Sequence, residues 1–124
     1  GHVNNSVYFS FYDLGKTSYF KDVIPNMSVN KDVGVVIANI QVNFILPVYP
    51  NEQVAVQTAV VEIGTKSFKL FQQLIDTDTN EVKCICHTVM VCFDAKTRST
   101  YPISEEWKNA MINFEGRGDL SKKV

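Results

Sequence analysis

Long apolar runs and long blocks of one charge are both missing from this sequence. It contains no stretch of 18 apolar residues, so it offers no predicted membrane span. Its 12 basic and 13 acidic residues give a formal net charge of −1. A nucleic-acid-binding domain usually carries a basic stripe and a high pI, whereas the pI here is about 6.1. We therefore expect neither a membrane nor a nucleic acid as a partner.

Cysteine is also scarce. The three residues Cys84, Cys86 and Cys92 lie on one segment, and an odd count there does not predict a disulfide framework. Cys84 and Cys86 are two positions apart and would share one face of a strand, while His87 would point to the opposite face. We therefore interpret the cysteines as small buried hydrophobic residues, with a metal site as the weaker alternative. Reduced thiols are typical of the cytoplasm, which we predict as the location.

The composition that is present fits one globular domain over residues 1–124, because 45% of the residues are hydrophobic and 20% are charged. There are no internal repeats. The apolar pattern predicts, in order, a helix at 5–21, strands at 34–46, 53–63, 67–76 and 82–93, and a helix at 104–114.

The first helix is expected to be buried. Asn4, Asn5 or Ser6 can cap its N-terminus. Its apolar residues cover nearly all sides, which is typical of a buried helix, and Asp13 and Lys16 mark the side expected to reach water. Ser104 is the expected N-cap of the closing helix.

The strand segments predict an α+β fold. Residues 34–46 alternate between apolar and polar positions, and short turns separate the strands, which favours an antiparallel meander covered by the first helix. Strand 82–93 has apolar residues on both faces. We therefore expect a homo-oligomer, either a symmetric dimer or a dimer of dimers.

The chain opens with Gly1-His2-Val3-Asn4-Asn5, and Tyr8 follows three residues later. This run resembles the motif Asp-x-x-Gly-His-Val-Asn-Asn-x-x-Tyr of the hotdog-fold acyl-CoA thioesterases related to 4-hydroxybenzoyl-CoA thioesterase. The resemblance continues over almost the whole chain, through residues 42–48, 60–67, 88–94 and 102–107.

The resemblance implies a hotdog fold, in which an antiparallel sheet wraps around a central apolar helix. It implies hydrolysis of an acyl-CoA thioester, or an acyl-carrier-protein thioester, to the free acid and the thiol, at a site between two subunits. Such hydrolysis needs a carboxylate that attacks or activates water, and a donor that stabilises the oxyanion. We expect no metal and no other cofactor.

Two catalytic positions follow from the resemblance. The backbone N–H of Asn5 would polarise the thioester carbonyl, because the first N–H groups of a helix lack intrahelical acceptors; alternatively, its side chain caps the helix. His2 would orient the carboxylate or contact the thioester. The alternative for His2 is a structural role in the loop before the helix.

Five further positions are implied in substrate binding, namely Asn4, Tyr8, Thr65, Lys66 and Ser67. Asn4 would hydrogen-bond across the pocket or the dimer seam, or would simply cap the helix. Tyr8 is expected to place its ring in the core and its hydroxyl at the pocket edge. The turn at 65–67 would reach substrate or CoA bound at a neighbouring subunit, or would be an ordinary exposed turn.

The family's Asp would lie three residues before Gly1, and the family's first strand would also precede it; the chain as given holds neither. Two hypotheses remain open. In one, the native protein carries the Asp and is a thioesterase. In the other, the chain is an inactive hotdog subunit that binds acyl groups or only assembles. A dehydratase is disfavoured, because it would need a different arrangement from Gly-His-Val-Asn-Asn.

Overall fold

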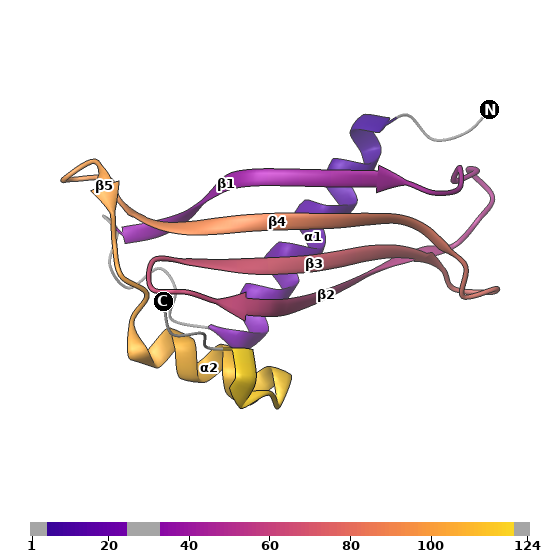
Figure 1. The fold of residues 1–124 in the computed structure, drawn as a ribbon. Coiled ribbons are helices and arrows are strands. Elements are labelled where there is room, and N and C mark those ends of the chain that lie inside the picture. The colour runs from indigo at the N-terminus through magenta and orange to yellow at the C-terminus, as the bar shows by residue number, and fades with distance from the viewer. Residues whose placement is uncertain (1–4, 25–32, 121–124) are drawn as a thin grey trace.

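The structure, a computed structural model, describes residues 5–24 and 33–120. Its elements, in chain order, are α1 (Asn5–Val23), β1 (Val33–Phe44), β2 (Val54–Ile63), β3 (Ser67–Asp76), β4 (Val82–Asp94), β5 (Ser99–Thr100), α2 (Glu105–Glu115) and the 3-10 helix η1 (Gly118–Leu120) (Figure 1). Every predicted helix and strand is present, and the ends differ from the prediction by at most about two residues. The α+β class is confirmed.

The order of the strands differs from the predicted meander. β2, β3 and β4 follow one another as antiparallel hairpins, but β1 pairs with β4, so the order is β1-β4-β3-β2. The meander prediction is therefore wrong for the first strand. The connection 45–53 permits this order because it has to cross only three inter-strand spacings, roughly 14 Å, at the end of the sheet. Among the four long strands, β1 and β2 form the edges.

The polar segment after β4 folds back on the sheet, and β5 pairs with Phe93 and Asp94 at the end of β4. Asp94 accepts hydrogen bonds from the backbone N–H groups of Lys96 (2.9 Å) and Thr97 (3.3 Å) within this turn. These bonds replace the ladder contacts that the turn residues lack.

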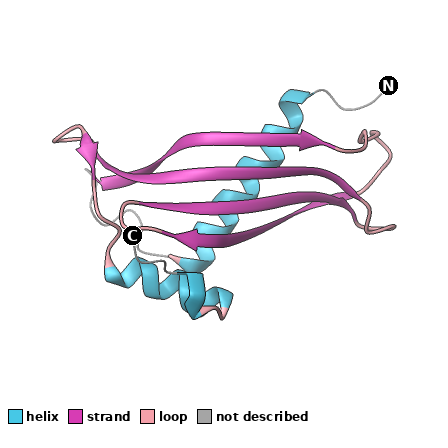
Figure 2. Ribbon diagram, viewed as in Figure 1, coloured by secondary structure: helices cyan, strands magenta, loops and turns pink. Residues whose placement is uncertain are grey.

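Helix α1 crosses one face of the sheet diagonally, and only the side facing the sheet is buried (Figure 2). Tyr8, Tyr12 and Lys16 follow one another at helical spacing on that side, whereas Leu14 on the other side is 68% exposed. The prediction of a helix buried all round is therefore wrong for the single chain. The prediction that Lys16 reaches water is also wrong, because its position one turn after Tyr12 places it in the same buried stripe. Asp13 is exposed, as expected.

The core consists of two clusters along α1. The first surrounds the N-terminal half of the helix and contains Tyr8, Tyr12, Val48, Leu74, Cys84 and Cys86. The second lies toward α2 and includes Phe20, Ile63, Phe68, Leu70 and Met111. Midway along α1, the helix approaches the sheet closely at Gly15, where an added Cβ would lie 2.8 Å from Gln72 Nε2. A side chain at this position would push the helix away from β2 and β3.

The cysteines are buried free thiols. Cys84 and Cys86 lie on the face of β4 that meets α1, within the first core cluster. His87 is exposed, and its ring centroid lies 5.1 Å from that of Phe71. The expectation that the thiols and the imidazole occupy opposite faces of the strand is confirmed.

Helix α2 closes one end of the molecule. Its N-cap is Ser104, as predicted, whose Oγ accepts a hydrogen bond from Trp107 N at 3.1 Å. At its other end, Glu115 accepts hydrogen bonds from Tyr19 Oη (2.6 Å) and from Val60 N (2.9 Å) on the edge strand β2. Burial and the hydrogen bond to Glu115 raise the pKa of Tyr19. Glu115 therefore joins α2 to both α1 and the sheet.

Candidate active site

The amino end of α1 is the feature to which the sequence assigned the chemistry. The described part of α1 starts at Asn5. The first N–H groups of a helix lack intrahelical acceptors, and the positive end of the helix dipole lies at this end. His2, Asn4 and the side chain of Asn5 lie outside the described residues. Their proposed contacts with a thioester remain predictions.

Tyr8, one turn into α1, links the helix to the sheet. Its ring is buried, with 3% of the residue exposed, and packs edge-to-face against Phe44 of β1 at a centroid distance of 5.0 Å. Its hydroxyl oxygen accepts a hydrogen bond from Val48 N at 3.2 Å. The expected core position of the ring is confirmed, whereas contact of the hydroxyl with a substrate remains a prediction.

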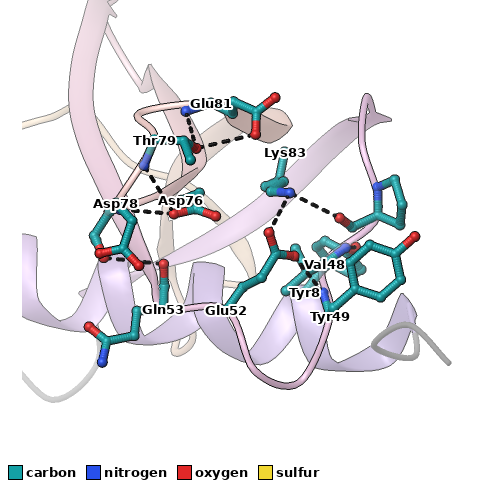
Figure 3. Close-up of polar contacts among 12 residues, drawn as sticks. Tyr8, Val48, Tyr49, Glu52, Gln53, Asp76, Asp78, Thr79, Glu81 and Lys83 are labelled. Carbon is teal, nitrogen blue, oxygen red and sulfur yellow. Dashed lines mark hydrogen bonds and ion pairs between the residues drawn. The ribbon is translucent and has the colours of Figure 1, made fainter.

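The connection 45–53, which contains Val48, is held by a buried ion pair (Figure 3). Lys83 Nζ lies 2.9 Å from Glu52 Oε2 and donates a hydrogen bond to the carbonyl oxygen of Pro47 at 3.3 Å. The two charged side chains are 5% and 18% exposed, respectively. The hydrogen bond to Glu52 raises the pKa of Lys83. The ammonium group therefore stays charged beside the carboxylate.

Asp76 lies next to this pair, at the end of β3 (Figure 3). Its Oδ1 accepts hydrogen bonds from Asp78 N (2.8 Å) and Thr79 N (3.3 Å) in the following turn. These donors, with the bond from Asp78 N the strongest, and the charge of Lys83 hold the pKa of Asp76 below its ordinary value. Asp76 therefore acts as an ionised cap of the β3–β4 turn.

Exposed apolar side chains border this region. Phe44, Ile45, Leu46 and Tyr49, which we call the apolar rim, are each at least 37% exposed. The rim lies beside Tyr8, as the ring contact with Phe44 and the hydrogen bond from Val48 show. A contiguous exposed apolar surface is typical of a ligand groove or a protein interface.

The turn Thr65–Lys66–Ser67 lies at the other end of the strands. Its carbonyl groups accept hydrogen bonds from Ile103 N at Thr65 and from Cys92 N at Lys66. Ser67 pairs with Val91, whereas Phe44 pairs with Cys84, so about seven residues of β4, or roughly 23 Å, separate the turn from the rim. A single chain does not bring these predicted binding residues together with Tyr8.

Sequence reasoning missed Lys83, Glu52 and Asp76. The pattern did contain a signal, since Lys83 is the only lysine or arginine in the mostly apolar strand β4, and Glu52 follows the Pro50-Asn51 turn. Nothing in the order of residues showed that the two would meet, because that contact depends on β1 pairing with β4. Within residues 5–24 and 33–120, no group of three or more His, Cys, Asp or Glu side chains is placed to hold a metal ion.

A separate hollow of about 360 Å³ opens on the face of the sheet opposite α1. Asn39, Gln41, Lys69 and His87 are its main polar residues, and Val61 and Val89 are among its apolar ones. It lies away from the amino end of α1, so it is not the site that the sequence predicted.

The thioesterase-like superfamily model matches residues 1–111. The chain belongs to the thioesterase-like superfamily. A search of curated proteins found no match.

Solved structures agree on the fold. A thioesterase from Thermus thermophilus, complexed with coenzyme A and Zn, has a TM-score of 0.81 and 24% identity, covering 94% of this chain and 84% of that one. A 1,4-dihydroxy-2-naphthoyl-CoA thioesterase from Synechocystis has a TM-score of 0.81 and 14% identity, covering 93% and 86%. A predicted thioesterase from Bacillus stearothermophilus has a TM-score of 0.80 and 24% identity, covering 91% and 83%.

The thioesterase-like chain therefore has the hotdog fold that its opening motif resembles, and the predicted fold is confirmed. In the described part of this superfamily member, no helix combines the length and the apolar character that crossing a bilayer requires.

Proposed function

We propose that this thioesterase-like chain hydrolyses an acyl-CoA thioester to a free acid and CoA. The observation that carries the proposal is the amino end of α1, described from Asn5 onward, which Tyr8 joins to the apolar rim through its contacts with Phe44 and Val48. The first N–H groups of a helix have no intrahelical acceptors. The N–H groups suit an oxyanion formed at the thioester carbonyl, and the rim suits an apolar acyl group. Water supplies the hydroxyl of the acid, and the thiolate of CoA leaves and takes up a proton.

The reaction also needs a carboxylate as nucleophile or general base. In the described residues, the nearest acid on α1 is Asp13, whose side chain is 72% exposed, while Glu52 is paired with Lys83. Neither suits the role. We propose that an Asp three residues before Gly1 supplies the carboxylate in the native protein, with His2 beside it.

We propose a homodimer as the active form, with β1 of one copy meeting β1 of the other. β1 carries no charged residue, its outer edge has no strand partner among the described residues, and Val36 and Ile37 are exposed. Long uncharged edge strands favour pairing with another chain. A partner is also what the predicted site requires, because only a second copy can bring the turn 65–67 close to the amino end of α1.

The test is thiol release from a panel of aliphatic and aromatic acyl-CoA substrates. The protein of residues 1–124 is compared with a version extended upstream through the motif Asp, and with the extended version carrying Asp→Asn at that position. The proposal predicts activity in the extended chain and a loss of at least about 10³-fold in the Asn variant. Equal, background activity in all three folded proteins would contradict it.

The second candidate function is a subunit that binds acyl groups or assembles without catalysis. The lack of a suitable carboxylate around α1 in the described residues favours it. The same panel separates the two once binding is measured as well, because an acyl-binding subunit would bind a non-hydrolysable acyl-CoA analogue but would release no thiol from any hydrolysable acyl-CoA of the panel.

A further inference from the structure

The residues between β1 and β2 are held one after another by polar contacts. The carbonyl oxygen of Lys83 accepts hydrogen bonds from Ile45 N and Leu46 N, both at 2.9 Å. Lys83 Nζ then donates to the carbonyl of Pro47 at 3.3 Å. A single residue of β4 therefore fixes the first half of the connection, from its backbone and its side chain together.

The contacts continue without a gap. Val48 N donates to the hydroxyl of Tyr8 at 3.2 Å, and Tyr49 N donates to Glu52 Oε1 at 2.8 Å. Glu52 in turn is bound to Lys83 through its other oxygen (Figure 3). Each residue from 45 to 49 thus has a defined polar partner, and Tyr8 is the partner that α1 supplies.

Stability alone does not account for a buried ion pair in this place. Removing two charges from water costs about as much as their attraction returns, so an apolar pair of similar volume is often as stable. An apolar pair, however, would offer nothing to the carbonyl of Pro47 or to Tyr49 N, which have no strand partner. What the ion pair provides is a fixed path for the connection.

We infer that Lys83 and Glu52 are positioning residues for the thioester site, which hold the connection 45–49 so that Tyr8 and the apolar rim keep their place beside the amino end of α1. The inference rests on the proposed function. It adds two residues that neither touch the substrate nor belong to the opening motif. They act through Tyr8 and the rim on the acyl group and on the carbonyl beside Asn5.

The expected effect of replacing Lys83 on the reaction rate follows from the geometry of the site. A displacement of about 1 Å at a reacting group can cost about 10²-fold in rate. Without the Lys83 side chain, the connection loses its contacts at Pro47 and the ion pair with Glu52. It keeps its backbone bonds to β4 and the bonds of Val48 N and Tyr49 N to the side chains of Tyr8 and Glu52. We expect Lys83→Met to lower kcat/KM by at least about 10-fold, and mainly through kcat, because a misplaced carbonyl is still bound but reacts slowly.

The experiment uses the extended chain of the activity assay and its best substrate. The variants are Lys83→Met, Lys83→Arg, Glu52→Gln and the double variant Lys83→Met/Glu52→Gln. The matched control is Lys108→Met, which removes a lysine from the Lys108–Glu105 pair (3.7 Å) on α2. Rates are measured at a temperature at which urea unfolding shows every variant to be folded, and amide exchange at 45, 46, 48 and 49 is measured in parallel.

The inference predicts a lower kcat and faster exchange at these amides for Lys83→Met, partial rescue by Lys83→Arg, and no further loss in the double variant. Lys108→Met should retain full activity. If Lys83→Met does not fold, Glu52→Gln, which keeps an oxygen for Tyr49 N, carries the same test. Unchanged kcat and exchange in folded variants of an active parent would overturn the inference alone. An inactive parent would overturn the proposed function and this inference with it.

Discussion

Helix α1 packs closely against the sheet at Gly15. The substitution Gly15→Ala is therefore the most informative test of this packing. An alanine Cβ would lie 2.8 Å from Gln72 Nε2, 2.8 Å from Val56 Cγ1 and 2.9 Å from Thr58 Oγ1. The first two contacts are roughly 0.7 Å shorter than the ~3.5 Å at which such atoms pack best. Three neighbours from two strands cannot all move aside, so the helix itself has to retreat.

Two effects of opposite sign determine how much Gly15→Ala changes the free energy of unfolding. Replacing glycine by alanine inside a helix favours folding by about 1 kcal/mol. Overpacking in a well-packed core costs about 1–3 kcal/mol, and retreat of the helix also lengthens the 2.9 Å hydrogen bond from Gln72 Nε2 to the carbonyl of Tyr12, which is worth about 1 kcal/mol. We therefore expect Gly15→Ala to lower the free energy of unfolding by about 1–3 kcal/mol.

Urea unfolding followed by circular dichroism measures this change. Gly34→Ala is the matched control, because a Cβ there meets nothing within 4 Å, and we expect it to change stability by less than about 0.5 kcal/mol. A Gly15→Ala protein as stable as the parent, or more stable, would refute the close approach of α1 to β2 and β3.

Three further predictions concern groups with defined partners. Glu115→Ala leaves two buried donors without an acceptor and should cost about 2–4 kcal/mol in urea unfolding; a loss below about 1 kcal/mol would contradict the hydrogen bonds assigned to Glu115. Because the pKa of Asp76 is lowered in the folded protein, the unfolded chain binds this proton first as the pH falls. Its stabilisation is thus complete above the ordinary carboxyl pKa and is lost on acidification, so Asp76→Asn should flatten the pH dependence of stability between about pH 5 and pH 2, and an unchanged slope would count against it. Burial raises the pKa of Cys92 to about 11, so a thiol reagent at pH 8 should label this cysteine only after unfolding, and rapid labelling of the native protein would show that it is accessible.

The sequence was sufficient for the elements and the fold class, because their signals are local. Alternation in 34–46, the turn residues around Asp78 and the cap at Ser104 depend on neighbours a few residues away. The pairing of β1 with β4 was out of reach, because short turns favour hairpins and the predicted strands 34–46 and 53–63 left only six residues between them, close to the length of a hairpin loop. Only packing decides whether β1 pairs with β2 in a hairpin or with β4.

The candidate site could be predicted only in part, for the same reason. The family motif identified Tyr8 and the start of α1 at Asn5, since both are near the N-terminus and fixed by helical spacing. Lys83 and Glu52 meet only because β4 lies beside the end of β1. The burial of Lys16 could not be predicted from its charge, because it results from the position of Lys16 in the buried stripe that Tyr8 and Tyr12 define.

The pairing of β1 with β4 also sets the order in which the chain can fold during synthesis. Val33 pairs with Asp94, so the first residue of β1 leaves the ribosome about 60 residues before its partner in β4. At about 5–20 residues per second, this delay is roughly 3–12 s. The hairpins β2–β3 and β3–β4 can form in about 1–10 μs once both of their strands have emerged. Until β4 has emerged, the strand with which β1 pairs is missing, and the nascent chain presents an uncharged strand to other nascent chains and to chaperones.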